Sequence, residues 1–472
     1  FGWGVIATLL FILVIILFIA FLIRIFNLNF NSPFIDEATY IILGKKILDG
    51  KILEVAGSTS WMGGFPFFFP FISAIFFSLA DILGSRFLNV ILGTIAIFLI
   101  YLFSKQLKLF NKDIENEWLG LAAAAFVTTS AIPIYLSRLA IYDGLSIVLF
   151  LLSIALLQKA SRGDRLENRG FFARNRKNYY LASAFVLFLS FLAKYFSLIF
   201  FPFFALLNFS LGKKGESFVK FFLFPLILFT LGYYYLNFES LNEFAKTQNE
   251  ASSRFSVMEI FLRYTLGAYL LAITGAILIY SKKKPFVLGL LALSFLPFVV
   301  HFAVANALSV HQHTYFSIIF LAPLVAVLAV ELIKRFKFGI FLVVSIFGIN
   351  LYLNFDKVSD LESFWPNSRA GVGILKIEIG KNDKILAESG DVVTLVLHNK
   401  VSSENIYGPF VFSYKELEGQ EAYYSAVADG FFNYVELDGT SFDQETRMQL
   451  EKRLIEKYSL IFDDGRIKIF KI

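Results

Sequence analysis

Long apolar runs recur along most of this chain, and they restrict its possible folds more than any other feature. Many of them span about 18 to 22 residues with few charges, the length that an α-helix needs to cross about 30 Å of hydrocarbon. Of the 472 residues, 57% are hydrophobic and 17% are charged, whereas about a quarter are charged in soluble domains. The sequence therefore predicts a polytopic α-helical membrane protein.

Lysine and arginine gather in short loops between the apolar runs, and this pattern predicts the topology. Cytoplasmic loops carry an excess of these residues, so an even number of crossings should separate each basic cluster from the next. The clusters begin at Lys105, Arg162, Lys213, Lys282 and Lys334. We therefore expect about eleven spans, with the N-terminus inside and the C-terminus outside. They lie near residues 3–26, 86–104, 118–136, 141–158, 179–193, 196–212, 217–236, 261–280, 286–307, 314–333 and 338–354.

The apolar run 65–83 is expected to be an interfacial or re-entrant juxtamembrane helix on the outer side. If it were a span, every later basic cluster would face outward. The transmembrane domain then covers residues 1–355. Its outer side carries a long first loop (27–85), a turn at 137–142 and a loop at 237–260.

Residues 356–472 differ in character from the rest of the chain. Short apolar runs occur at 384–387, 392–397 and 467–470, and an amphipathic helix is expected over about 443–458. This mixture predicts a small extracytoplasmic α/β domain.

Composition excludes several functions. The chain has no cysteine, which excludes disulfides, thiolate metal sites and cysteine nucleophiles. Its net charge of +6 does not indicate nucleic-acid binding, because the basic residues lie in short loops between spans.

Ionisable residues also gather at the expected outer ends of the spans, and such groups at membrane depth are functional candidates by default. Lys194 is the clearest case, because it lies between two very apolar segments on the less basic side and has no topogenic role. The full set is Asp36, Glu37, Arg86, Arg138, Asp143, Lys194, His301, His311 and His313.

Several of these residues also have a structural explanation. Asp36 can cap a helix over 37–49 with Glu37 in its first turn, and Arg86 can extend its side chain to the headgroups. Asp143 can pair with Arg138 across the turn. His311 and His313 can ligate a metal, but two histidines without a defined third ligand are a weak signal.

Taken together, the residues indicate a site that binds a phosphate while a carboxylate handles a proton. Arginine and lysine neutralise a lipid-linked phosphate. A carboxylate can deprotonate an acceptor hydroxyl for attack at an anomeric carbon, through an oxocarbenium-like transition state. The phosphate is then the leaving group, and nearby cations stabilise its developing charge.

Five motifs follow one another in an order that resembles a known superfamily. They are DEATY at 36–40, GSRFLN at 84–89, LSRLAIYD at 136–143, FLAKY at 191–195 and HTY at 313–315 followed by Pro323. The set is similar to that of the GT-C polyprenyl-phosphate-dependent glycosyltransferases, which include protein O-mannosyltransferases and aminoarabinose transferases. Ala193 replaces the threonine of that superfamily's Thr-Lys-Tyr segment.

The resemblance implies inverting transfer of one sugar from a dolichyl- or undecaprenyl-phosphate donor on the extracytoplasmic face. The acceptor would be a glycolipid, a glycan or a protein. Asp36 would be the catalytic base with Glu37 beside it, and Asp143 would support the acceptor side. The donor phosphate would meet Arg86, Arg138, Lys194 and His313, with Tyr40, Tyr195, Tyr315 and His311 as further candidates.

A divalent cofactor stays open, with Asp36, Glu37 and Asp143 as candidate ligands. The tail does not resemble the β-trefoil of eukaryotic mannosyltransferases. It resembles the small α/β tails of prokaryotic members, so a protein Ser/Thr acceptor is not implied. The absence of cysteine and the abundance of Lys, Ile and Phe are typical of a prokaryote, which predicts a location in a prokaryotic cell membrane.

Two other functions remain open. A transporter or flippase of a lipid-linked sugar would also need many spans and outer cations, although transporters tend to contain internal repeats and broken helices. A non-catalytic membrane scaffold would bind a partner through the tail, and it would not need Asp36, Asp143 and Lys194 in one cavity.

Overall fold

The computed structural model describes residues 3–162, 171–210, 215–247, 252–410 and 412–472. They form two compact units. The first unit contains Phe1–Leu28 and Lys46–Val358, and the second contains Asn29–Lys45 and Ser359–Ile472. Parts of two expected basic clusters, residues 163–170 and Lys213 with Lys214, lie outside the described residues, as does the stretch 248–251 of the loop expected at 237–260.

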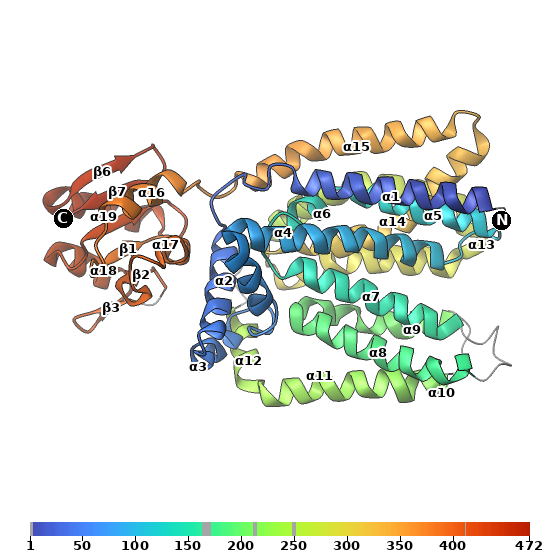
Figure 1. The fold of residues 1–472 in the computed structure, drawn as a ribbon, viewed down its shortest axis with the longest axis horizontal. Coiled ribbons are helices and arrows are strands. Elements are labelled where there is room, and N and C mark those ends of the chain that lie inside the picture. Colours follow the sequence, from blue (N-terminus) through green and yellow to red (C-terminus); the bar gives the residue numbers. More distant parts are fainter. Residues whose placement is uncertain (1–2, 163–170, 211–214, 248–251, 411) are drawn as a thin grey trace. The chain divides into compact units, whose positions relative to one another are not determined.

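The first unit is a bundle of helices (Figure 1). Two of its helices, α2 and α15, continue into the second unit. In chain order the elements are α1 (Trp3–Ile25), α2 (Ile35–Leu48), α3 (Ile52–Ala56), η1 (Gly57–Ser60), α4 (Phe69–Gln106), α5 (Asp113–Thr128), α6 (Ala131–Leu136), α7 (Asp143–Arg162), α8 (Phe171–Ala193), η3 (Tyr195–Phe200), α9 (Phe201–Ser210), α10 (Gly215–Phe218), η4 (Val219–Leu223), α11 (Phe224–Leu236), α12 (Phe238–Thr247), α13 (Arg254–Val304), α14 (Val310–Arg335) and α15 (Gly339–Glu362).

Within the described residues, 7 helices are long and apolar enough to cross a membrane. The protein is therefore an integral membrane protein, but the expected number of spans is not confirmed. One reason is that α13, 51 residues long, joins two expected spans through non-helical backbone at Lys283. Another is that the expected span 118–136 forms two helices, α5 and α6, which are interrupted at Thr129 and Ser130.

The apolar run 65–83 is helical from Phe69 onward and is continuous with the expected span 86–104 as α4. Non-helical backbone at Ala80 and Asp81 separates the two parts of α4. Gly84 lies just beyond this bend, where a Cβ atom would be 2.0 Å from the carbonyl oxygen of Phe76. Glycine is therefore required for the close approach of the two parts.

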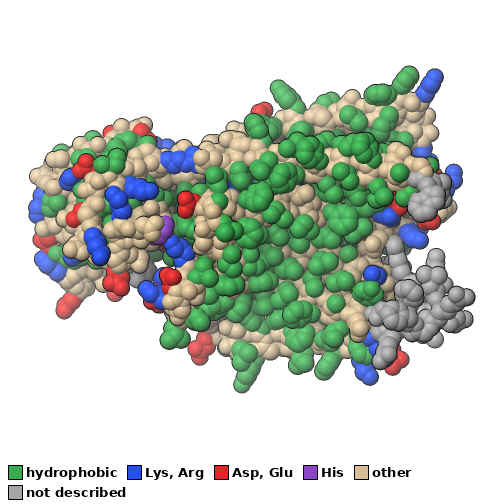
Figure 2. Space-filling model, viewed as in Figure 1, with side chains coloured by type: hydrophobic (Ala, Val, Ile, Leu, Met, Phe, Trp, Pro, Cys, Tyr) green, Lys and Arg blue, Asp and Glu red, His purple; other side chains and the backbone are tan. Residues whose placement is uncertain are grey.

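The outside of the bundle is apolar. Figure 2 shows hydrophobic side chains over most of the visible face of the helices, and large residues such as Phe11, Leu228 and Ile277 are exposed. Inside the bundle, α14 is the most enclosed of the candidate spans. Its Phe316 packs against Phe150 and Phe200, with ring centroids 5.3 Å and 4.8 Å apart. An apolar exterior of this kind is suited to lipid.

The second unit has a five-stranded mixed sheet in the order β2-β1-β5-β7-β6. Strands β2, β1 and β5 are parallel, while β7 runs antiparallel to β5 and β6. The elements are α16 (Arg369–Glu378), β1 (Ile385–Ala387), α17 (Gly390–Leu397), η5 (Ser403–Asn405), β2 (Ile406–Tyr407), β3 (Ser413–Tyr414), β4 (Leu417–Glu418), α18 (Gly419–Asp429), β5 (Tyr434–Leu437), α19 (Gln444–Lys457), β6 (Ser459–Asp463) and β7 (Lys468–Lys471).

The small α/β region predicted from the sequence is confirmed. The expected amphipathic helix is α19, which begins after Asp443, whose side chain accepts a hydrogen bond from the Thr446 amide. The apolar runs 384–387 and 467–470 form β1 and β7, whereas 392–397 lies in the helix α17. Val392, Val393, Leu395 and Leu397 of α17 are buried, so tertiary packing outweighs the β-propensity of the valines.

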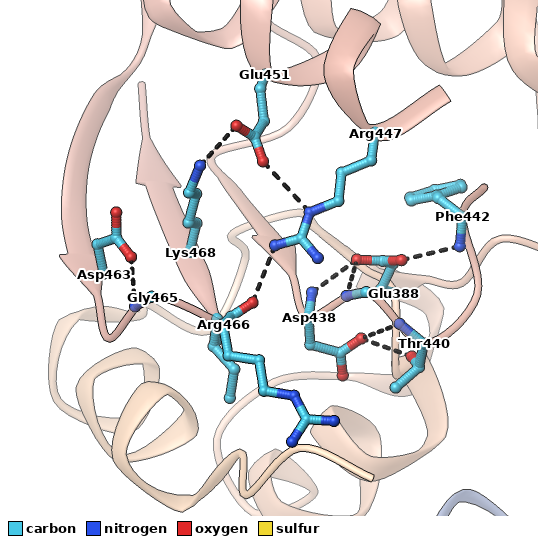
Figure 3. A network of polar contacts seen from close by, with 12 residues as sticks. Glu388, Asp438, Thr440, Phe442, Arg447, Glu451, Asp463, Gly465, Arg466 and Lys468 are labelled. Carbon is cyan, nitrogen blue, oxygen red and sulfur yellow. Dashed lines mark hydrogen bonds and ion pairs between the residues drawn. The ribbon is translucent and has the colours of Figure 1, made fainter. Parts of the chain in front are cut away.

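A buried carboxylate, Glu388, organises the loop after β5 (Figure 3). One of its oxygens accepts the amide hydrogens of Asp438 and Gly439 at 2.6 and 2.7 Å, and the other accepts those of Ser441 and Phe442 at 3.2 and 2.8 Å. The neighbouring Glu436 is also fully buried. Its pKa is raised well above the ordinary value, first by burial and then by the charges of Asp438 and Glu388.

Residues 29–45 of the expected first loop belong to this second unit. Asn31 donates to the carbonyl oxygens of Glu362 and Trp365 at 3.0 and 3.1 Å. The indole nitrogen of Trp365 donates in turn to the Ser32 carbonyl at 3.1 Å. Because these contacts are reciprocal, the 29–45 segment and the tail form one packed body.

Candidate active site

A break in the helical chain positions Lys194. Helix α8 ends at Ala193, Lys194 has extended backbone, and η3 begins at Tyr195. Two hydrogen bonds to the first loop satisfy backbone groups at this break: the Tyr195 amide donates to the Gly63 carbonyl at 2.9 Å, and the Phe65 amide donates to the Leu192 carbonyl at 2.6 Å. The break is therefore a fixed feature, because its backbone groups are paired.

Gly64 allows the first loop to reach this break. A Cβ atom on Gly64 would lie 2.3 Å from the carbonyl oxygen of Ala193. No side chain fits there without moving backbone. The first loop thus holds the residue before Lys194 through direct backbone contact.

Serine pairs set the alignment of α7 with α8. The hydroxyl of Ser190 donates to the Ser146 carbonyl at 2.9 Å, and the hydroxyl of Ser146 donates to the Ser190 carbonyl at 3.1 Å. Ser153 and Ser183 repeat the arrangement further along, with both bonds at 2.8 Å. Small hydroxylated residues allow close helix packing of this kind in membranes. Asp143, the first residue of α7, is thereby brought beside Lys194.

Lys194 and Asp143 form a buried ion pair. The Lys194 ammonium lies 2.5 Å from Oδ1 of Asp143, and their side chains are only 4% and 5% exposed. The ammonium also donates to Oε1 of Gln312 at 2.9 Å, and it lies 5.2 Å from the centre of the Tyr142 ring. Oδ2 of Asp143 has no hydrogen-bond partner among the described residues. A buried pair of this kind is costly to desolvate, which makes a purely stabilising role a weak explanation.

Two histidines lie in contact next to Gln312. Nε2 of His301 is 2.6 Å from Nδ1 of His313, and Nδ1 of His301 is 2.7 Å from the Asn306 carbonyl oxygen. The Phe196 ring stacks on His313 with centroids 3.4 Å apart and an interplanar angle of 6°. The contact between the two histidines was not predicted from the sequence, because His301 lies on α13 and His313 on α14.

Three arginines are buried near the end of α1. Arg86 donates to the Leu28 carbonyl at 3.0 Å and Arg138 donates to the Ile23 carbonyl at 2.7 Å. Arg86 is 0% exposed, so the alternative that it extends to the headgroups is wrong.

The third of these arginines, Arg24, was not among the residues predicted from the sequence. It is fully buried and donates to the Ser137 hydroxyl at 3.2 Å. A single arginine at the end of an apolar run ordinarily extends to the membrane surface. No feature of the sequence therefore distinguished Arg24 from a surface residue.

The remaining candidate site residues of the first unit are Tyr195, Tyr315 and His311, and each has different neighbours. The hydroxyl of Tyr195 contacts that of Tyr233 at 2.6 Å, and the Tyr315 hydroxyl is buried without a hydrogen-bond partner among the described residues. His311 lies 6.2 Å from the Tyr135 ring, measured between ring centroids.

Asp36, Glu37 and Tyr40 lie on α2 in the second unit. The helix begins at Ile35, so both carboxylates are in its first turn. Glu37 is fully buried, and its Oε2 accepts the Phe34 amide hydrogen at 2.8 Å, as the glutamate of a capping box does. Glu37 therefore contributes to the start of the helix, while Asp36 lies beside it, partly exposed.

A protein binds a metal ion through several donor side chains that lie close together. Among the residues that the structure describes, no group of three or more His, Asp or Glu side chains is arranged to hold a metal ion.

The fold of this chain is that of the GT-C glycosyltransferases. No protein-family model matches the sequence, and no curated protein matches it. The likeness is found among solved structures. ArnT from Cupriavidus metallidurans bound to undecaprenyl phosphate matches with a TM-score of 0.61 and 12% identity, over 100% of this chain and 98% of that one.

The archaeal oligosaccharyltransferase AglB from Archaeoglobus fulgidus is also similar. Its complex with an inhibitory peptide and a dolichol-phosphate matches with a TM-score of 0.57 and 11% identity, over 93% of this chain and 70% of that one. A second structure of the A. fulgidus oligosaccharyltransferase, with Zn and sulfate, gives a TM-score of 0.54 at 12% identity. These comparisons confirm the fold expected from the five motifs.

Proposed function

We propose that this protein is a membrane glycosyltransferase that moves one sugar, with inversion, from a polyprenyl-phosphate donor to an extracytoplasmic acceptor. The observation that carries the proposal is the buried Lys194–Asp143 pair at a fixed break between helices. A fold shared with a protein that has been crystallised with undecaprenyl phosphate supports it. The match to almost the whole of that protein favours a similar chain organisation.

The proposed reaction replaces one bond at the anomeric carbon. A carboxylate, which we assign to Asp36, removes the proton from an acceptor hydroxyl, and the resulting oxygen attacks the anomeric carbon. The bond between that carbon and the phosphate oxygen breaks, and the polyprenyl phosphate leaves with the electron pair. Inversion follows because the acceptor attacks from the face opposite the leaving phosphate.

The cations of the first unit would stabilise the leaving phosphate. Lys194, Arg86 and Arg138 are the proposed phosphate ligands, since positive groups in a water-excluded site favour the charge that develops in the transition state. Asp143 orients the Lys194 ammonium through one carboxylate oxygen. Glu37 maintains the helix on which Asp36 lies.

The test is transfer from a radiolabelled polyprenyl-phosphate sugar by the purified protein in native membrane extract. Wild type should label a glycolipid, a glycan or a protein, and Asp36→Asn should not, while its melting temperature stays unchanged. Asp49→Asn is a matched control, because Asp49 is an exposed carboxylate that follows the same helix. A fully active Asp36→Asn variant would refute the role given to Asp36.

A transporter of a lipid-linked sugar is the second candidate, because the interruption at Lys194 is the kind of broken helix that transporters use at their binding sites. Proteoliposomes separate the two functions. Movement of the intact labelled lipid to the opposite leaflet without transfer would favour the transporter.

A further inference from the structure

Two buried hydrogen-bond acceptors lie around Lys194. Oδ2 of Asp143 and Nε2 of His313 have no hydrogen-bond partner among the described residues, and the two residues are only 4% and 6% exposed. Asp143 contacts Lys194 directly, and His313 follows Gln312, which also accepts a hydrogen bond from Lys194. Buried acceptors normally have donors, so both atoms point to a ligand that supplies them.

The backbone at the end of α13 determines which nitrogen of His301 carries its hydrogen. Ala305 has left-handed backbone with φ of 50°, and the Asn306 amide donates back to the His301 carbonyl at 3.2 Å. This turn places the Asn306 carbonyl oxygen 2.7 Å from Nδ1 of His301. A carbonyl oxygen can only accept a hydrogen bond, so Nδ1 of His301 must be the donor.

The contact between the histidines then determines the tautomer of His313. A neutral His301 with its hydrogen on Nδ1 has a lone pair on Nε2, so Nδ1 of His313, 2.6 Å away, must donate to it. Nε2 of His313 consequently carries a lone pair. A charged imidazole would add a second buried cation near Lys194, which is unfavourable in a poorly hydrated interior.

We propose that Nε2 of His313 and Oδ2 of Asp143 accept hydroxyl groups of the sugar carried by the polyprenyl-phosphate donor. His313 would be a specificity-determining residue, and His301 a positioning residue that acts through it. This inference rests on the proposed function. It replaces the phosphate role expected for His313, because a lone pair repels phosphate oxygens and attracts hydroxyl hydrogens. A sugar differs from a bare polyprenyl phosphate in bringing such hydroxyls.

Three lipids and three variants test the proposal in the 472-residue protein in nanodiscs. The probes are undecaprenyl phosphate and its glucosyl and mannosyl phosphodiesters, with binding measured by native mass spectrometry. His313→Asn retains a polar group near the position of Nδ1 but lacks a distal acceptor. His313→Gln places an amide oxygen near the position of Nε2. His398→Asn is the matched control, because His398 lies in the second unit and its Nδ1 contacts the Leu395 carbonyl.

The expected result is selective. His313→Asn should weaken binding of a sugar-linked lipid about tenfold and leave binding of undecaprenyl phosphate unchanged, whereas His313→Gln should recover much of the loss. Equal weakening for both kinds of lipid would show that His313 binds the phosphate and would overturn the inference. Unchanged binding of both would also overturn it, without affecting the proposed function if wild type still transfers sugar. Failure of wild type to bind either kind of lipid would remove both proposals.

The tautomer itself can be measured independently of any lipid. The chain has 4 histidines, and ¹⁵N chemical shifts of the labelled wild type distinguish a protonated from an unprotonated ring nitrogen. His313 should have hydrogen on Nδ1 and none on Nε2, with its signals assigned by their loss in His313→Asn. A hydrogen on Nε2 would overturn the inference whether or not any lipid binds.

Discussion

The ammonium of Lys194 lies 2.5 Å from a carboxylate oxygen of Asp143, across the interface between the end of α8 and the start of α7. The pair joins two helices that are already aligned by reciprocal serine hydrogen bonds. It also leaves one carboxylate oxygen available in a buried site.

This relationship predicts strong coupling between the two residues. Lys194→Met or Asp143→Asn alone should each destabilise the protein by about 3–5 kcal/mol, because one buried polar or charged partner is left behind. The double variant should lose clearly less than the sum. Thermal unfolding of the four proteins of this double-mutant cycle in detergent measures the coupling. Additive losses would show that the two side chains do not interact.

A methyl group on Gly64, in the first loop, should shift the backbone that positions Lys194. Gly64→Ala places a Cβ atom 2.3 Å from the Ala193 carbonyl oxygen, so the loop or the break must move, at a cost of about 1–3 kcal/mol. We expect a lower melting temperature and reduced sugar transfer. Gly57→Ala is the control, since nothing lies within 4 Å of its Cβ position. If both variants behave alike, the loop does not position Lys194.

Glu388 should be essential to the second unit. Glu388→Gln replaces one of two accepting oxygens with an NH₂ group that faces amide donors. The loss should reach at least about 2 kcal/mol, since hydrogen bonds to a charged group are strong. Hydrogen exchange of the amides at 438–442 should rise in this variant. Glu404→Gln, at an exposed carboxylate, should leave that exchange unchanged.

Glu436 should make the stability depend on pH. Its folded-state pKa is raised above the ordinary value of 4.5, so the folded protein retains a proton that the unfolded chain releases. Its contribution to stability is complete below about pH 4.5 and is lost as the pH rises through the folded-state pKa. The Glu436→Gln variant has a neutral amide in place of the carboxyl group, so it does not ionise as the pH rises. Melting curves of both proteins between acidic and neutral pH should therefore diverge toward neutral pH, with the variant the more stable. Parallel curves would contradict the role of Glu436.

The helical membrane fold was predictable because the length and composition of an apolar run are properties of a single segment. Hydropathy located the helices, and the α19 amphipathic pattern located a helix of the second unit. The helix breaks were harder to predict. Lys194 was recognised as unusual, but its extended backbone depends on hydrogen bonds to Gly63 and Phe65, which lie far away in sequence.

The candidate site could be predicted only in part, because its contacts join segments that are far apart in sequence. The motifs around Asp143, Lys194 and His313 were recognised one at a time, and the ion pair between Lys194 and Asp143 was not predicted. Arg24 and the His301–His313 contact depend on which helix faces meet, and a single sequence does not specify that. The helix α17 likewise takes its conformation from its packing rather than from its β-branched residues.

The second unit is connected to the first at three places in the chain, after Leu28, after Lys45 and after Val358. Cutting the chain after Val358 would therefore not release the tail, because Asn31, Ser32 and Trp365 would still hold it to the 29–45 segment. The tail and the part of α2 that bears Asp36 therefore belong to one packed unit, and a displacement of the tail displaces that carboxylate with it.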